Sequence, residues 1–369
     1  MKYGLLKAAP IIALLCGRAA ADDQGRLRTD EPRTGTTLEE MPGPTLTLLW
    51  DWLPGGAANA SPVLAAGRCY FATSAGQVYA YDLATGAQAW QVSTGAAVLS
   101  SPCLDGGVLY VASGDGFLSA LRASDGATVW SVSHGPGTVS SPVVSGGTVY
   151  VGGGSIDQNQ VRAYRASDGV LQWSFTTEQP CWSSPAVSGG LVYCGSNGGF
   201  LYCIDAATGV EVWRYNTTAS HMGAAPAVSG GQVIFPAGST TTNVLVLDAA
   251  TGALIRTIAP LDNGTSQAWA DPGPLGATDS WYYMSGAAVD GNAAYVTQEL
   301  MGATGFGGTA MLQMRLFALD ITNGATLWRN RWNVNGVGSS FASCPSVSRR
   351  PSAPAYVYAA LGNRLVCLD

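Results

Sequence analysis

The sequence predicts an all-β fold, a seven-bladed β-propeller, on three observations. A motif recurs every 40 to 43 residues, 48 of the 369 residues are glycine, and only 11% of residues are charged. Average chains carry about 25% charged residues and about 7% glycine, so the composition excludes coiled coils, long-helix proteins and disordered acidic chains. After residue 45 no apolar run has the 3.6-residue period of a helix.

Each repeat opens with a small residue and, in most units, a proline, continues through Gly-Gly and an apolar-Tyr-apolar strand, and closes with a turn acid, a glycine and a tryptophan. The openings are Ser61-Pro62, Ser101-Pro102, Ser141-Pro142, Ser184-Pro185, Ala225-Pro226, Gly286-Ala287 and Cys344-Pro345. Successive tryptophans lie 40, 43 and 40 residues apart, at Trp90, Trp130, Trp173 and Trp213. A further step of 43 residues reaches Arg256. Repeats of this length with four β-type segments are typical of propellers, whereas solenoid repeats of similar length are helical.

Four strands, A to D from the centre outward, are expected in each blade. In the third repeat they are Ser141–Val144, Thr148–Gly152, Val161–Arg165 and Leu171–Phe175. The seventh unit stops at Asp369, before its D strand, and Leu46–Trp50 has the missing pattern. We therefore expect Leu46–Trp50 to complete the last blade and close the ring, which removes exposed sheet edges. The large, flat D-strand indoles are expected to fill the gaps between blades: Trp50, Trp90, Trp130, Trp173, Trp213 and Trp328.

The amino-terminal residues predict export. Lys2 and Lys7 precede a short apolar run at 8–15, and Ala19-Ala20-Ala21 fits a cleavage site, so residues 1–21 are expected to be a signal peptide. A buried N-terminal helix is the alternative. Residues 22–44 are expected to form a flexible leader and residues 45–369 the propeller. The expected protein is a periplasmic or extracellular monomer without a transmembrane segment, since no apolar run approaches about 20 residues.

The charge pattern excludes several chemistries. Lys2 and Lys7 are the only lysines, so the body of the chain has no residue for a Schiff base or a P-loop. A nucleic-acid partner is also excluded, because it requires clustered Lys and Arg.

The repeat elements resemble the PQQ-like repeat family. The matching elements are Leu109-Tyr110-Val111, Phe317-Ala318-Leu319-Asp320, and Thr208-Gly209 with Trp213. The resemblance implies a propeller and one of two roles: a larger, eight-bladed quinoprotein dehydrogenase with bound PQQ and calcium, or a binding propeller similar to the lipoprotein of the outer-membrane barrel-assembly machine. The chain lacks the adjacent cysteine pair of many such dehydrogenases and a Cys-x-x-Cys-His haem site. It departs from the lipoprotein in its seven countable blades and in the bulky Leu15 before Cys16.

Candidate ligand-binding residues gather on one predicted face. B-to-C and D-to-A loops emerge on the same side of the ring, and the two long insertions, Thr257–Met284 and Gln298–Gln313, both fall there. Long loops on a rigid scaffold often carry function, and aromatic residues with arginine are the composition of binding hot spots. The alternative is that these aromatics only pack against the blades. The candidates are Trp269, Trp281, Tyr282, Tyr283, Arg315, Arg331, Trp332, Trp182, His134 and His221.

Other patterns predict structure rather than chemistry. The two histidines lack metal-ligand spacing and no Gly-x-Ser-x-Gly turn is present, so no metal site and no catalytic residue are predicted. Acids repeated at one position indicate turn hydrogen bonds: Asp82, Asp205, Asp248, Asp320 and Asp369. A two-residue turn at Gly198-Gly199 would place Cys194 opposite Cys203, which predicts a cross-strand disulfide in an exported protein.

The leading functional hypothesis is a non-enzymatic binding or scaffold module without a cofactor, for a protein or cell-envelope ligand. The alternative is a dehydrogenase of alcohols or sugars that uses PQQ and calcium. In that case Arg315 and Arg331 would meet the cofactor's carboxylates, and Asp271 or Asp279 would be the calcium ligand or general base. A purely structural envelope component is the third hypothesis.

Overall fold

The computed structural model describes residues 36–37, 61–137, 140–153, 159–218, 224–237, 243–259, 280–284, 286–303, 309–333, 346–348, 356–361 and 364–368. It describes the backbone alone for residues 36–37, 280–284, 298–303, 309–315 and 329–333, and for the ranges after 333. In this part of the chain every regular element is a β-strand. The predicted all-β class is therefore confirmed.

The described strands form seven sheets, six of four strands and one of five. The first three sheets are β2 to β5 (Val63–Ala65, Arg68–Ala72, Gln77–Asp82, Gln88–Ser93), β6 to β9 (Cys103–Asp105, Val108–Ala112, Phe117–Arg122, Thr128–Ser133) and β10 to β13 (Val143–Ser145, Thr148–Gly152, Gln160–Arg165, Leu171–Thr176). The next two are β14 to β17 (Ala186–Ser188, Leu191–Gly195, Phe200–Asp205, Glu211–Asn216) and β18 to β21 (Ala227–Ser229, Gln232–Ala237, Asn243–Asp248, Leu254–Ile258).

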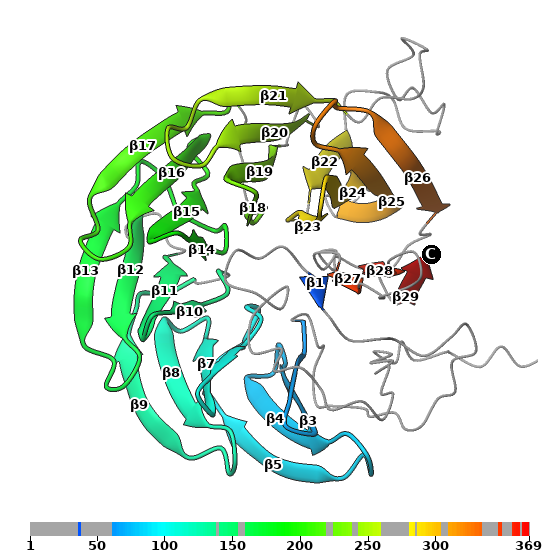
Figure 1. Ribbon diagram of the computed structural model, residues 1–369. Coiled ribbons are helices and arrows are strands. Elements are labelled where there is room, and N and C mark those ends of the chain that lie inside the picture. Colours follow the sequence, from blue (N-terminus) through cyan, green and yellow to red (C-terminus); the bar gives the residue numbers. More distant parts are fainter. Residues whose placement is uncertain are drawn as a thin grey trace, which may run out of the picture.

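The sixth sheet contains β22 to β26 (Ser280–Met284, Ala288–Asp290, Ala293–Ala303, Thr309–Asp320, Thr326–Asn333). The last contains β1 (Thr36–Thr37) and β27 to β29 (Ser346–Ser348, Tyr356–Leu361, Arg364–Leu368). Figure 1 shows the sheets arranged radially, with β10, β14, β18, β23 and β27 near the centre and β5, β9, β13, β17, β21 and β26 at the circumference. This is the predicted propeller architecture. That the ring contains seven blades and no more stays a prediction.

The last sheet includes a strand from the amino-terminal segment. β1 pairs in parallel with β27, Thr36 opposite Val347, at the central end of the sheet. Leu46–Trp50, the predicted closing strand, lies outside the described residues, so closure at the outer edge stays a prediction.

Serine hydroxyls join neighbouring sheets around the central axis. The backbone amides of Ser61, Ser101 and Ser141 each donate to the hydroxyl of the serine that opens the next repeat, at 2.9, 2.9 and 2.8 Å. The last acceptor in this series is Ser184. Because the inner strands lie close together, only a small side chain fits here, and its hydroxyl satisfies an amide that would otherwise be buried without a partner. The repeated Ser-Pro openings are thus structural.

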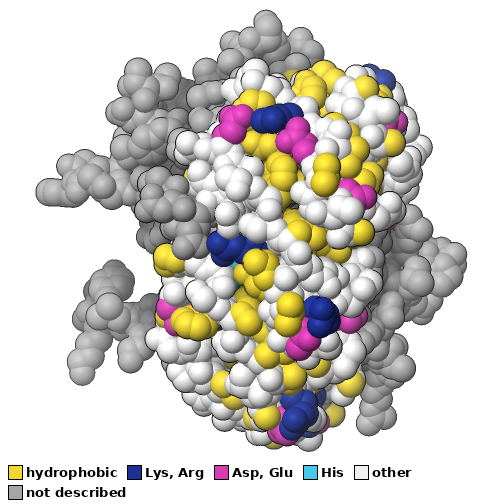
Figure 2. All heavy atoms as spheres, turned by 90° about the vertical axis from the view of Figure 1, so that its left-hand side faces the viewer, with side chains coloured by type: hydrophobic (Ala, Val, Ile, Leu, Met, Phe, Trp, Pro, Cys, Tyr) yellow, Lys and Arg dark blue, Asp and Glu magenta, His cyan; other side chains and the backbone are white. Residues whose placement is uncertain are grey.

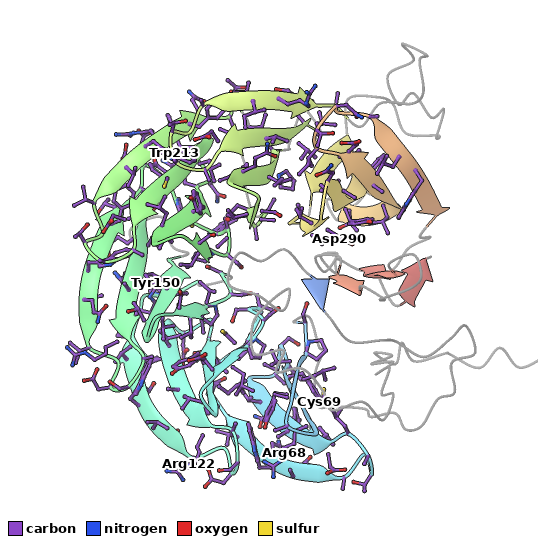
Figure 3. The ribbon with its side chains drawn as sticks, viewed as in Figure 1. Arg68, Cys69, Arg122, Tyr150, Trp213 and Asp290 are labelled. Atoms are coloured by element: carbon purple, nitrogen blue, oxygen red, sulfur yellow. A yellow bond between two sulfur atoms is a disulfide. The ribbon has the colours of Figure 1, made fainter. Side chains whose placement is uncertain are left out.

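Tryptophan side chains join the same sheets at larger radius. In four consecutive repeats the D-strand indole Nε1 donates to a carbonyl oxygen in the turn of the next sheet: Trp90 to Ala123 (2.9 Å), Trp130 to Ala166 (2.9 Å), Trp173 to Ala206 (2.9 Å) and Trp213 to Ala249 (3.0 Å). A tyrosine ring packs beside each indole, as between Tyr150 and Trp173, whose ring centroids lie 5.8 Å apart. Figure 3 shows Tyr150 and Trp213 at this level between the blades.

Arg256 replaces tryptophan in the fifth repeat and makes the equivalent contact. Its guanidinium donates to the carbonyl oxygens of Thr322 (2.7 Å) and Asn323 (3.1 Å) in the turn of the next sheet. Arg256 therefore supplies a hydrogen bond between the fifth and sixth sheets where the other repeats use a tryptophan.

The outer circumference carries mixed side chains. Its strands expose aliphatic residues, among them Val129, Leu171, Val212 and Leu327. Figure 2 shows this side, where arginines lie next to acidic residues among scattered hydrophobic side chains. Two of these ion pairs, Arg122–Asp125 and Arg165–Asp168, are about half exposed, so each contributes little to stability.

The repeated acids cap the turns between the last two strands. Asp82 Oδ1 accepts from the amides of Ala84 (3.0 Å) and Thr85 (2.8 Å) and from the Thr85 hydroxyl (2.8 Å). Asp205 and Asp248 make the same contacts, and Asp320 makes a similar set. The threonine hydroxyl, followed by the backbone amides, lowers the pKa of these carboxyls. The predicted turn role is seen at each of these positions, and Asp369 lies outside the described residues.

These lowered pKa values predict acid sensitivity. The folded pKa of each acid lies below its unfolded value, so the stabilisation is present above about pH 4 and is lost as the pH falls through the folded pKa. We expect the free energy of unfolding of the double variant Asp205→Asn, Asp248→Asn to fall less steeply than that of the wild type as the pH decreases below 4. Urea unfolding midpoints from pH 7 to pH 2.5 measure this. Parallel curves for the two proteins would contradict it.

Candidate functional site

Backbone hydrogen bonds in the first four sheets place the B-to-C and D-to-A loops on the same side of the ring. Each D-to-A loop begins by donating to the B-to-C loop of its own sheet: Thr94 to Gly76 (2.8 Å), His134 to Gly116 (2.6 Å), Thr177 to Asn159 (2.7 Å) and Thr217 to Gly199 (2.8 Å). Both loop types therefore lie on one side of the ring, which we call the loop face.

The sixth sheet extends toward the loop face beyond its neighbours. β24 has 11 residues and β25 has 12, whereas the corresponding strands of the third sheet have 5 and 6. β22 pairs with the extension of β24, Tyr283 opposite Glu299. The segments 298–303, 309–313 and 280–284, predicted as loop, are thus strands, and that prediction is wrong for them.

The strand register brings together candidate residues that are far apart in sequence. One row of the sheet runs from Tyr283 through Glu299 and Met314 to Trp332. The next row runs from Met284 through Gln298 and Arg315 to Arg331. Six candidates thus share this one sheet: Trp281, Tyr282, Tyr283, Arg315, Arg331 and Trp332.

Two arginines occupy directly opposed positions in this sheet. Arg315 on β25 pairs in register with Arg331 on β26. Like charges at opposed positions of an antiparallel pair disfavour folding, so this pairing lowers the stability of the sheet unless a negative group lies nearby. Glu299 lies one row away, and neighbouring rows alternate between the two faces of the sheet, so Glu299 does not share the face of the two arginines. The strand register therefore places two positively charged residue types at opposed positions.

Of the remaining candidates, Trp182 and His134 lie on loops of other sheets. Trp269 and His221 lie outside the described residues, as do Asp271 and Asp279. Trp182 lies on the loop between the third and fourth sheets and is partly exposed.

His134 is buried beneath the loop face. Its Nε2 lies 3.1 Å from the Gly152 carbonyl oxygen and its Nδ1 lies 3.2 Å from the Tyr164 hydroxyl. A carbonyl oxygen only accepts, so Nε2 carries the proton and Nδ1 accepts from Tyr164. Burial lowers the pKa of His134 to about 4. The side chain has no exposed surface, so the structure does not support His134 as a ligand-binding residue.

The buried histidine predicts a second pH effect. Because the folded pKa is about 4 and the unfolded pKa is about 6.5, the unfolded state binds the extra proton as the pH falls between these values. We expect a loss of about 3 kcal/mol of folding stability from pH 7 to pH 4 through this group. NMR titration of the two histidines checks it. A His134 resonance that titrates near pH 6.5 would contradict the buried placement.

The disulfide differs from the predicted one. Cys194 is bonded to Cys181, 13 residues away, and Cys203 is a buried free thiol, as is Cys69. The hairpin turn has three residues, 197–199, so Cys194 stands opposite Tyr202 and not Cys203. The one-residue shift places the Cys194 and Cys203 side chains on opposite faces of the sheet, so the predicted Cys194–Cys203 bond is wrong.

Among the side chains that the structure describes, no three His, Cys, Asp or Glu residues gather closely enough to hold a metal ion. The described part of the chain contains no helix with the length and apolar character needed to cross a membrane.

Comparison with known proteins identifies the relatives of this fold. No curated protein matches the sequence. The crystal structure of BamB from Moraxella catarrhalis is 18% identical with a TM-score of 0.61, and the match covers 87% of this chain and 88% of that one. A quinohemoprotein alcohol dehydrogenase from Pseudomonas putida HK5 is 18% identical with a TM-score of 0.62, covering 92% and 71%. The enzyme of the same description from Comamonas testosteroni is 15% identical with a TM-score of 0.59, covering 93% and 77%.

The sequence also matches a family model along nearly its whole length. The model is described as outer membrane protein assembly factor BamB, and its overlapping matches are residues 23–174, 116–272 and 157–369. The repeats, the radial sheets and these matches agree, and the chain belongs to the PQQ-like repeat family of the outer membrane protein assembly factor BamB.

Proposed function

We propose that this protein is a non-enzymatic binding or scaffold module that is exported to the cell envelope and holds a protein partner on its loop face. The observation that carries the proposal is the extended sixth sheet, on which β22, β24, β25 and β26 share aromatic and arginine positions. The family description and the BamB structure support a partner-binding role. The predicted signal peptide at 1–21 supports export.

A sheet is a better support for a binding site than a loop. Hydrogen-bonded strands hold their side chains with little residual freedom, so less conformational entropy is lost when a partner binds. Tryptophan, tyrosine and arginine are the residues most enriched in binding hot spots. Trp281, Tyr282 and Arg331 place all three residue types on one sheet, and Trp269 is a further candidate.

Partner capture with matched variants tests this proposal. Partners captured by the wild type from envelope extracts are identified by mass spectrometry, purified, and titrated against the variants Trp281→Ala, Arg331→Ala and Trp269→Ala. We expect a loss of affinity of tenfold or more for Trp281→Ala and Arg331→Ala, without a decrease in the temperature of thermal unfolding. Val212→Ala, an exposed substitution on β17, serves as the control. Undiminished affinity in all three variants would contradict the site.

The alternative is a quinone-dependent dehydrogenase. The two quinohemoprotein alcohol dehydrogenases that match over 92% and 93% of the chain favour it, as does the opposed Arg315–Arg331 pair. The described side chains do not supply a calcium site, and the candidate ligands Asp271 and Asp279 lie outside them. Dye reduction by the purified protein with PQQ, calcium and an alcohol or sugar would support this alternative; the binding proposal predicts no reduction.

A further inference from the structure

Three arginines share one face of the sixth sheet. Arg315 on β25 is opposed to Arg331 on β26, and residues that are opposed in register lie on the same face of a sheet. Arg329 is two residues before Arg331 on the same strand, and alternate residues of a strand share a face. The strand register thus gathers three positively charged residues on this one face, which we call the arginine face.

The positions of these arginines are exposed in other repeats. The residues one and three after the outer-strand tryptophan correspond to Arg329 and Arg331, and both are exposed in each of the first four sheets. Phe117 holds the position of Arg315 in the second sheet and is 44% exposed. The register is the same in the second and sixth sheets, because the tryptophan stands opposite an alanine of the third strand in both. The repeat therefore places the three arginines where other blades are open to solvent.

The fourth sheet shows how this position is neutralised when it holds a single arginine. Arg214 occupies the position of Arg329, and its guanidinium bonds to Glu211 at 2.9 Å and to Glu178 at 3.0 Å. In the sixth sheet the residue at the position of Glu211 is Thr326. The sixth sheet thus carries three arginines without the acid that the fourth sheet provides on the same strand.

The arginine face looks toward the fifth sheet. Phe317 is opposed to Arg329, so it shares this face, and it belongs to one buried cluster with Val246 and Ile258 of the fifth sheet. The charges of the fifth and sixth sheets are therefore the ones to compare with the three arginines.

The acids described in these two sheets do not offset the arginines. Asp248 and Asp320 cap turns and Asp290 ends β23, and these turns lie at the end of the sheets away from the loop face. Glu299 lies on the other face of the sixth sheet, since its row alternates with the row of Arg315. The arginine face is therefore positive, although the chain as a whole has a net charge of −6. Charge complementarity favours an anionic partner here.

The shape of the partner follows from the strand that carries two of the arginines. β26 stands last in the described strand order of its sheet and has 8 residues, whereas the other outer strands at the circumference have 5 or 6. An extended segment can pair with an edge strand of this kind. Residues of that segment opposite Arg329 and Arg331 are two apart and share their face, and opposite charges at opposed positions stabilise a sheet.

We propose that the sixth sheet binds an extended acidic segment of a partner protein along β26, with Asp or Glu at alternate positions opposite Arg329 and Arg331. Arg315 adds positive charge on the same face. This inference rests on the proposed binding role and names the chemistry of the partner. Capture of a partner that has no acidic segment would leave the binding role standing and remove this inference, whereas acidic-peptide binding without a captured partner would do the reverse.

Peptide titration followed by fluorescence anisotropy tests the acidic occupant. The probe is a fluorescein-labelled nine-residue peptide of alternating Glu and Thr; one counterpart has the same composition with its glutamates in a single block, and another alternates Lys and Thr. We expect the alternating Glu-Thr peptide to bind most tightly, with an affinity that falls as salt rises. Arg329→Gln is expected to weaken it about threefold, and the triple variant Arg315→Gln, Arg329→Gln, Arg331→Gln about tenfold or more.

Arg214→Gln is the matched control. It removes the same residue type from the same repeat position, but from a site whose charge is already paired with Glu178 and Glu211. Its affinity for the Glu-Thr peptide is expected to equal that of the wild type. The double variant Arg329→Glu, Arg331→Glu is expected to reverse the preference in favour of the Lys-Thr peptide.

Urea unfolding supplies a second readout that needs no ligand. Because opposed like charges disfavour the sheet, Arg331→Gln is expected to unfold at the same urea concentration as the wild type or at a higher one. A lower midpoint would indicate that acids of the chain itself pair with the arginines, and would overturn the proposal. The acids of the segment between β21 and β22, which lie outside the described residues, would then be the ones to substitute: Asp262, Asp271 and Asp279.

The titrations can overturn the proposal in several ways. Equal binding of the Lys-Thr or the block peptide, unchanged affinity in the triple variant, or weakening by Arg214→Gln equal to that by Arg329→Gln would each do so. Binding of phosphatidylglycerol vesicles in place of the peptide would assign the arginines to a membrane surface instead, and would overturn it as well.

Discussion

Replacing Trp173 with alanine is expected to lower the free energy of unfolding by about 3–5 kcal/mol. The indole is more than nine-tenths buried, packs against Tyr150 and donates to Ala206 in the next sheet. Its loss removes apolar contact from both sheets and leaves the gap between them unfilled. Because domains are stable by only about 5–15 kcal/mol, this one change removes a large part of the total.

Urea unfolding followed by circular dichroism measures the effect. Val212→Ala is the control, because surface substitutions of this kind change stability by about 0.5 kcal/mol or less. A loss below about 1 kcal/mol for Trp173→Ala would contradict the role of the repeated tryptophans as the contacts that join the blades.

Gly169→Ala is expected to destabilise the protein more than Gly147→Ala by about 1–3 kcal/mol. Both glycines lie in the third repeat with positive φ, +73° and +76°, so both substitutions carry a similar backbone strain of about 1 kcal/mol. A Cβ at Gly169 would lie 2.8 Å from Cε3 of Trp130, whereas a Cβ at Gly147 would have no atom within 4 Å. The difference between the two variants therefore measures the close packing of the turn on the indole.

The comparison uses the same unfolding assay for both variants. Equal losses would show that the backbone conformation alone requires the glycine. Gly209→Ala, whose Cβ would lie 2.7 Å from Cδ2 of Trp173, is expected to behave as Gly169→Ala does.

The sequence alone predicts the repeated part of this fold well. In the third repeat the expected Thr148–Gly152 is the observed β11, and the expected Leu171–Phe175 is one residue shorter than β13. This success has a physical basis, since each repeat must make the same contacts with its neighbours and so keeps the same small, turn and aromatic residues. Arg256 shows the limit, because the sequence does not reveal that a guanidinium makes the tryptophan contact there.

The candidate site was harder to predict where pairing depends on register. A hairpin loop of three residues instead of two shifts the register, so that Cys194 does not pair with Cys203. The number of residues between the two cysteines does not show which loop length forms. Likewise, residues 298–303 of β24 extend the strand because β22 pairs with them. β23 lies between β22 and β24 in the sequence, so the spacing of the repeats does not reveal this pairing. His134 is in a predicted surface loop, but hydrogen bonds to Tyr164 and Gly152 hold its ring inside.

Native mass spectrometry of the protein isolated from its own source, without added ligands, tests the binding role most directly. The account predicts a complex whose added mass is that of a protein chain, and which dissociates in the Arg331→Ala and Trp281→Ala variants. An added mass equal to one quinone and one calcium ion, together with dye reduction by the same sample, would contradict it.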